Sequence, residues 1–195
     1  MKTDFILASS SPQRQAILTS LKLLFDVIPA HIDESVKPNE DAMTYVQRLA
    51  LEKAEKIFAD QFNHKPVLGA DTCVVLDEVI FGKPENELQA FEMLKQLSGK
   101  THQVLTAVAI VNDQQKKCLL SKTEVSFNSL TDEEIHAYVS SGEPMGKAGA
   151  YAIQGLGGIF ISHIHGSYSG VVGLPVCETA ALLKAFSIPI IHVHP

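Results

Sequence analysis

The stretch Val67–Leu76, which reads VLGADTCVVL, is apolar and rich in β-branched residues, and it predicts a strand buried on both faces. Asp71 is the only charged residue in it. A buried carboxylate has to be protonated, hydrogen-bonded or bound to a cation, so Asp71 is a candidate functional residue. The alternative is a strand end, with Asp71 at the edge of the sheet.

The segments on either side of this stretch alternate between strand and helix patterns. Further strands are expected at Phe5–Ala8, Phe25–Pro29, Val79–Phe81, His102–Val111, Leu119–Phe127 and Ile159–Ile164. Helices are expected at Pro12–Leu21, Asp41–Ala59, Asn86–Leu97, Thr131–Gly142 and Pro175–Phe186. Because several strands follow one another directly, the pattern favours an α/β fold with a mixed sheet and flanking helices over a purely parallel sheet.

Composition describes an ordinary globular chain of 195 residues with 46% hydrophobic and 19% charged residues. This length predicts a single domain over residues 1–195, which a deep cleft could divide into two lobes. The net charge of −6 argues against binding to DNA or RNA, which requires a basic face. An anionic small substrate would need local cations or a metal ion.

Cysteine usage and hydropathy predict a cytoplasmic protein. The cysteines are three, widely spaced and without a CxxC zinc pattern, which is typical of a reduced chain rather than a disulfide framework. The apolar runs are too short to span a bilayer, and the N-terminus carries no signal-peptide pattern. No membrane partner is therefore expected.

The segment Ser9–Arg14 has the pattern of a phosphate-binding site. A strand ends, hydroxyl groups follow, and a helix begins with Ser11 as its cap and Pro12 in its first turn. Free N–H groups at a helix N-terminus attract anions, and the Arg14 guanidinium could add further donors. The alternative is a capped helix with a solvated arginine.

Lys53 interrupts an apolar face of the helix expected at Asp41–Ala59. It lies seven residues after Val46 and four before Ile57, near the centre of that face. A lysine there has to be paired or to reach a polar cleft, unless its stem packs while the ammonium extends to water. Both interpretations stay open.

Two further segments could contact a ligand. Lys83 follows Gly82 after a predicted hairpin and could point into a cleft, although a surface lysine is the commoner outcome. Gln154 lies within Gly142–Gly158, where glycines would allow the backbone to approach a ligand closely. An irregular turn is the alternative.

These motifs together resemble the Maf family, a branch of the Maf/Ham1-type nucleotide pyrophosphatases. The resemblance covers almost the whole chain, with the motifs in family order. It is carried by Leu7–Arg14, Val46–Lys53, Leu68–Thr72, Gly82–Pro84, Leu97–Gly99, Ser141–Pro144, Lys147–Tyr151, Ile153–Gly155, Ser167–Tyr168 and Val172–Pro175.

The resemblance implies two lobes around a nucleotide-binding cleft, a homodimer, and a divalent cation such as Mg²⁺ or Mn²⁺. It implies hydrolysis of a nucleoside triphosphate to its monophosphate and pyrophosphate, with Asp71 as the general base. By the same match, the triphosphate would be bound by Ser9, Arg14, Lys53 and Lys83, and Glu34 would help Asp71 to hold the metal.

Three positions separate the branches of the family by base preference, here Gln13, Thr72 and Gln154. Thr72 and Gln154 match the branch that prefers dTTP and UTP, and an amide at Gln154 could satisfy a donor and an acceptor on a pyrimidine. Gln13 departs from that branch, which usually has arginine, so a different base preference is one alternative.

Two other functions stay open. A nucleotide-binding regulator of septum formation and cell division would bind without catalysis, and a phosphatase would release orthophosphate stepwise. A buried general base favours the enzyme, because a protein that only binds nucleotides has no use for one.

Overall fold

The computed structural model describes residues 3–61 and 65–190, and these residues divide between two compact units. Unit 1 comprises residues 1–71, 106–121 and 173–195, and unit 2 comprises residues 72–105 and 122–172. The boundary thus falls within a strand, between Asp71 and Thr72. A single domain over residues 1–195 stays a prediction.

The sheet is mixed, as the sequence predicted. Its order is β2-β1-β3-β5-β6-β7, and β4 also pairs with β3. The pairs β1–β2 and β1–β3 are parallel, whereas β3–β4 and β6–β7 are antiparallel. The strands are β1 (Phe5–Leu7), β2 (Phe25–Val27), β3 (Val67–Leu76), β4 (Val79–Phe81), β5 (Thr101–Val111), β6 (Lys116–Phe127) and β7 (Ile161–His165).

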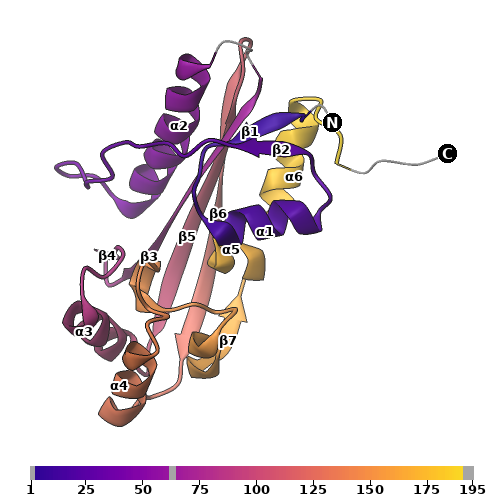
Figure 1. The fold of residues 1–195 in the computed structure, drawn as a ribbon. Coiled ribbons are helices and arrows are strands. Elements are labelled where there is room, and N and C mark those ends of the chain that lie inside the picture. Colours follow the sequence, from indigo (N-terminus) through magenta and orange to yellow (C-terminus); the bar gives the residue numbers. More distant parts are fainter. Residues whose placement is uncertain (1–2, 62–64, 191–195) are drawn as a thin grey trace. The chain divides into compact units, whose positions relative to one another are not determined.

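Helices in unit 1 cover both faces of its strands (Figure 1). The helices are α1 (Pro12–Ser20), α2 (Ala42–Asp60) and α6 (Val176–Ala185). Ala54 and Ile57 of α2 pack with Val67 on one face of β3, whereas Leu18 of α1 packs with Leu68 on the other. Since successive side chains of a strand alternate between faces, Gly69 and Asp71 lie on the α2 face.

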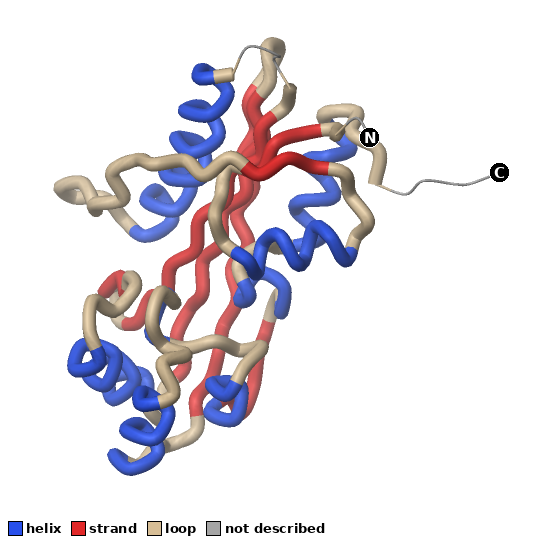
Figure 2. Tube along the Cα trace, viewed as in Figure 1, coloured by secondary structure: helices blue, strands red, loops and turns tan. Residues whose placement is uncertain are grey.

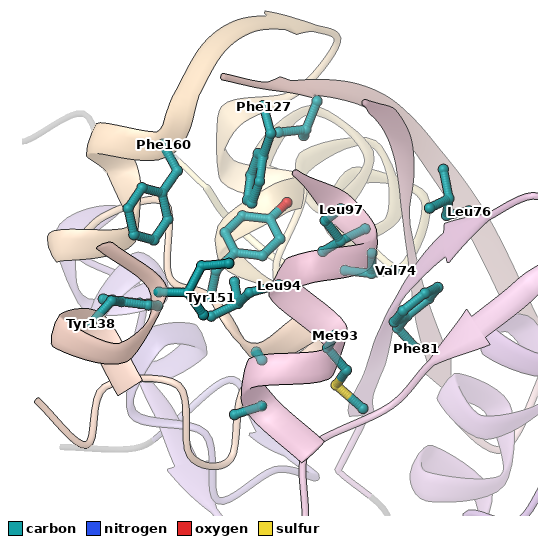
Figure 3. Close-up of a cluster of buried hydrophobic side chains, with 14 of the residues drawn as sticks. Val74, Leu76, Phe81, Met93, Leu94, Leu97, Phe127, Tyr138, Tyr151 and Phe160 are labelled. Carbon is teal, nitrogen blue, oxygen red and sulfur yellow. The ribbon is translucent and has the colours of Figure 1, made fainter. Parts of the chain in front are cut away.

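Unit 2 has its own hydrophobic core beneath α3 (Glu87–Leu97) and α4 (Asp132–Ser140). Figure 3 shows Phe127, Tyr138, Tyr151 and Phe160 gathered on one side of that core. Their rings meet edge to face, with Phe127 and Tyr151 centroids 4.9 Å apart and Tyr138 and Phe160 centroids 5.0 Å apart. Edge-to-face pairs of this kind stabilise a core beyond their buried area.

Most predicted elements are confirmed to within a few residues at their ends. Figure 2 shows the helices in blue and the strands in red. The last strand is displaced, because Ile159 and Phe160 belong to a 3₁₀ helix, η2 (Leu156–Phe160), and β7 begins at Ile161. The sequence did not predict the short helices η1 (Ala148–Ala150) and α5 (Tyr168–Val172). None of the helices in residues 3–61 and 65–190 has the length and hydropathy to cross a membrane.

Candidate functional site

Lys53, Asp71 and Glu34 form an ion-pair cluster in unit 1. The Lys53 ammonium donates to Oδ1 of Asp71 at 2.6 Å and lies 2.6 Å from Oε1 of Glu34. Lys53 and Asp71 are 6% and 7% exposed, whereas the Glu34 side chain is 39% exposed. Of the two interpretations that the sequence left open for Lys53, the buried and paired lysine is the one that the structure has, and the ammonium does not extend to water.

Asp71 is in the middle of its strand. It is the fifth of the ten residues of β3, and β3 is an interior strand with β1 and β5 as neighbours. The alternative of a strand end at the sheet edge is therefore wrong. Removal of one partner from a buried ion pair destabilises a protein by about 3–5 kcal/mol, because the other charge stays buried without a partner. Lys53 and Asp71 therefore each make the burial of the other possible.

A glycine brings α2 onto β3 at this cluster. A Cβ atom at Gly69 would lie 2.2 Å from the carbonyl oxygen of Ala50 and 2.8 Å from the nitrogen of Ala54. Lys53 lies between these two residues on α2, and Asp71 follows Gly69 by two residues on the same face of β3. The missing side chain thus allows the helix to approach until the ammonium reaches the carboxylate.

The start of α1 has the capped geometry that the sequence predicted. The Ser11 hydroxyl accepts from the Arg14 N–H at 3.4 Å, and Pro12 is in the first turn. Ser9, 7% exposed, accepts at Oγ from the Ser11 N–H at 3.2 Å. Oε1 of Gln13 accepts from the Ser11 hydroxyl at 3.2 Å.

Arg14 is partly buried and its guanidinium is held in place. Nε donates to the carbonyl oxygen of Gly173 at 2.8 Å, and Nη1 donates to Oγ of Ser9 at 3.2 Å. The alternative of a solvated arginine is therefore wrong. Burial lowers the pKa of Arg14, while the charges of Asp71 and Glu34 act to raise it. An arginine keeps its proton even so, and Arg14 remains a cation that interacts electrostatically with both carboxylates.

The remaining predicted site residues belong to unit 2. Thr72 is partly buried in β3, and Lys83 and Gln154 are exposed. The carbonyl oxygen of Gly82, next to Lys83, accepts from the Gly149 N–H at 3.0 Å. This bond ties the segment that carries Lys83 to the glycine-rich segment within unit 2. The roles predicted for Thr72, Lys83 and Gln154 stay predictions.

Glu143 holds the segment that follows Gln154. Its carboxylate accepts from the N–H groups of Leu156 at 3.0 Å and Gly157 at 2.9 Å, and from the Tyr138 hydroxyl at 2.9 Å. Three donors on one carboxylate fix the backbone there. The glycine-rich segment is thus held in place within unit 2, and its predicted contact with a ligand stays a prediction.

Sequence reasoning missed three residues that shape the unit 1 cluster: Gly69, Tyr45 and Arg48. Tyr45 and Arg48 donate from α2 to the backbone of the segment that carries Glu34. The sequence held one signal, the spacing of four between Arg48 and Glu52, which is typical of an ion pair on a helix.

Comparison with known proteins gives the family. Residues 4–186 match the family described as "Maf-like protein". The chain is 48% identical over 193 residues to a "dTTP/UTP pyrophosphatase" of Pasteurella multocida, covering 95% of this chain and 96% of the relative. It is 50% identical over 185 residues to a protein of the same name from Shigella dysenteriae, covering 95% and 94%.

The fold also resembles a solved structure at low sequence identity. The Ham1 protein of Staphylococcus aureus matches with a TM-score of 0.52 and 13% identity, over 94% of this chain and 97% of that one. This likeness supports the mixed α/β architecture and concerns the fold alone. The family match over residues 4–186 and the two relatives show that the chain belongs to the Maf-like protein family.

Proposed function

We propose that this chain is a nucleoside triphosphate pyrophosphatase that hydrolyses dTTP and UTP to the monophosphate and pyrophosphate. The observation that carries the proposal is the buried pair of Lys53 and Asp71, with the Glu34 carboxylate on the same ammonium. The names of the Pasteurella and Shigella relatives supply the substrates.

Cations at the site would bind the triphosphate. Arg14 offers a guanidinium, and the N-terminus of α1 adds the partial positive charge of the helix dipole next to Ser9. Lys53 supplies a second positive charge in unit 1. Lys83 would supply a third positive charge, a role that rests on its match to the family motif. Such charges stabilise the negative charge that develops as the α-phosphorus is attacked.

Asp71 is proposed as the general base. A water oxygen forms a bond to the α-phosphorus, the bond from that phosphorus to the α–β bridging oxygen breaks, and pyrophosphate leaves with the bonding electrons. Asp71 takes the proton from the water and later releases it to solvent. Lys53 keeps the carboxylate in place, because its Nζ lies 2.6 Å from Oδ1.

A divalent cation, Mg²⁺ or Mn²⁺, fits the acidic residues of the cluster. Oxygens of Asp71 and Glu34 both lie 2.6 Å from the Lys53 nitrogen, so the two carboxylates lie close enough together to share a cation beside that ammonium. No group of three potential ligands occurs in residues 3–61 and 65–190, and Mg²⁺ is often held by one or two carboxylates plus substrate phosphates. When bound, the cation would neutralise phosphate charge and polarise the attacking water.

Base preference is assigned to Gln154 and Thr72, whose family motifs point to pyrimidines. Gln13 is the open position, and its amide is already engaged with the Ser11 hydroxyl. A glutamine there removes the charge and the fork of donors that an arginine would give. If Gln13 decides the base, the chemistry stays the same and another nucleotide becomes the preferred substrate.

The test is a product assay. The purified protein is incubated with Mg²⁺ and dTTP, UTP, CTP, GTP or 7-methyl-GTP, and the products are separated by chromatography. TMP or UMP with pyrophosphate is expected. Orthophosphate released stepwise would favour a phosphatase, and binding of nucleotides without turnover would favour a regulator of septum formation.

We also propose a cytoplasmic homodimer that binds neither nucleic-acid polymers nor membranes. The net charge of −6 supports the exclusion of nucleic acids. Light scattering coupled to size-exclusion chromatography tests the oligomeric state, and a mass of one chain would contradict a dimer.

A further inference from the structure

The Glu34 side chain belongs to a segment without helix or strand, between Val27 at the end of β2 and Ala42 at the start of α2. Helix α2 holds this segment at two consecutive residues. The Tyr45 hydroxyl donates to the carbonyl oxygen of Glu34 at 2.9 Å, and Nη2 of Arg48 donates to the carbonyl oxygen of Ser35 at 3.0 Å. The backbone that carries the carboxylate is therefore fixed to the helix.

Arg48 itself is locked by carboxylates. Its Nε and Nη2 donate to the two oxygens of Glu40 at 2.5 and 2.7 Å, and Nη1 donates to Glu52 at 3.0 Å. The side chains of Arg48 and Glu40 are only 13% and 5% exposed. The guanidinium also lies 5.6 Å from the centre of the Tyr45 ring. The two parallel hydrogen bonds to Glu40 fix the orientation of the guanidinium, and in this orientation Nη2 donates to the carbonyl oxygen of Ser35.

Spacing along α2 connects this lock to the ion-pair cluster. Tyr45, Arg48 and Glu52 follow one another at three and four residues, which places them on one side of the helix. Lys53, which holds the carboxylate of Glu34, is the residue after Glu52. The main chain and the side chain of Glu34 are thus both fixed to the same helix.

We propose that Arg48 and Tyr45 are positioning residues that hold the Glu34 carboxylate opposite Asp71, where the two acids bind a divalent cation. The proposal rests on the cation of the proposed function. Neither residue touches the cation, so each acts through Glu34. A lysine at position 48 keeps the charge but cannot hold Glu40 and Ser35 at once, because it lacks the planar fork.

The experiment is a double-mutant cycle on the binding of Mn²⁺ alone. The electron paramagnetic resonance signal of free Mn²⁺ gives the dissociation constant for the wild type, Arg48→Lys, Glu34→Gln and the double variant. We expect Arg48→Lys to raise the dissociation constant about tenfold, the lower end of the effect of residues that support a metal ligand. In the Glu34→Gln background the same change should add nothing.

Two further variants keep the test sharp. Tyr45→Phe removes only the hydroxyl that donates to Glu34 and should raise the dissociation constant less than Arg48→Lys does. Lys37→Gln is the control, because it removes an exposed cation of the same segment whose ammonium lies 3.2 Å from Glu52. Its Mn²⁺ affinity should equal that of the wild type.

The outcomes separate this proposal from the proposed function. An equal effect of Arg48→Lys with and without Glu34, or no effect at all, overturns the positioning role while leaving the pyrophosphatase intact. A wild type that does not bind Mn²⁺ overturns both the positioning role and the cation. In turnover assays, Arg48→Lys should raise the Mn²⁺ concentration that gives the half-maximal rate. At saturating Mn²⁺ the same variant should change kcat by less than about threefold.

Discussion

The Lys53 ammonium lies 2.6 Å from Oδ1 of Asp71, and both residues are more than nine-tenths buried. If Asp71 is the general base, Asp71→Asn should retain nucleotide binding and lose at least about a hundredfold in kcat, because an amide of the same size cannot take the proton. Single-turnover kinetics and a binding titration measure the two effects separately.

Asp77→Asn is the matched control, since it removes the same charge from the exposed turn after β3. Asp77 has φ 48°, a conformation that asparagine tolerates well. Its activity should equal that of the wild type. Near wild-type turnover of Asp71→Asn would remove Asp71 from the role of base.

Gly69→Ala should destabilise the protein and reduce turnover. The new methyl group would overlap the carbonyl oxygen of Ala50, so α2 would have to move away from β3 and take Lys53 with it. Overpacking of this kind costs about 1–3 kcal/mol. Urea denaturation measures the loss of stability.

Gly82→Ala is the control, because a Cβ atom at Gly82 would meet no atom within 4 Å. It should change the free energy of unfolding by less than about 0.5 kcal/mol. Equal effects at both positions would contradict the close approach of α2 to β3 at Gly69.

Gln154→Glu should lower kcat/KM for dTTP and UTP at least about tenfold relative to GTP, because a carboxylate cannot donate to an acceptor on the pyrimidine. The ranking of substrates is the readout. Gln114→Glu adds the same charge at another exposed position, in the turn between β5 and β6, and should leave the ranking unchanged. If Gln154→Glu also leaves it unchanged, Gln154 does not select the base.

The stability of unit 2 should depend on pH through His102. This side chain is 2% exposed, its Nε2 lies 2.8 Å from the Tyr151 hydroxyl, and burial lowers its pKa from 6.5 to about 4. Well above pH 6.5, the His102 imidazole is neutral in both the folded and the unfolded protein. As the pH falls from 6.5 to 4, the unfolded chain gains a proton that the folded protein does not, which costs about 3 kcal/mol in total.

Urea denaturation at a series of pH values between 7 and 4 tests this dependence. His102→Gln should flatten the slope in that range, whatever its stability at pH 7. His165→Gln, at a side chain that is 93% exposed, should keep the slope of the wild type. An equal slope in all three proteins would assign the acid sensitivity to other groups.

Residues that break a regular pattern were the most predictable part of the site. Lys53 interrupts an apolar helix face and Asp71 an apolar strand, and burial of such positions requires a partner, which each supplies to the other. The cap of α1 was equally predictable, because Ser11 accepts from the Arg14 N–H within its own first turn. These features depend on local chemistry that a single segment contains.

Other features depend on contacts between segments far apart in the chain. Ile159 looked like the start of a strand, yet it is 73% exposed in a 3₁₀ helix, where Glu143 holds the preceding Leu156 and Gly157. Glu34 came from the family resemblance alone, since nothing around it reveals that Tyr45 and Arg48 fix its backbone. Secondary-structure propensity carries no information about such tertiary hydrogen bonds.

The boundary between the compact units has a practical consequence for protein engineering. Grafting residues 72–105 and 122–172 from a relative would replace Thr72, Lys83 and Gln154 while retaining Gln13, Arg14, Lys53 and Asp71. A chimera of this kind would inherit two of the three selectivity positions and none of the acids assigned to hydrolysis. Because one unit boundary falls between Asp71 and Thr72, such a chimera would take the proposed selectivity residues Thr72 and Gln154 from the relative, together with Lys83, and keep the proposed general base of this chain. Gln13 would be the remaining proposed selectivity position to exchange separately.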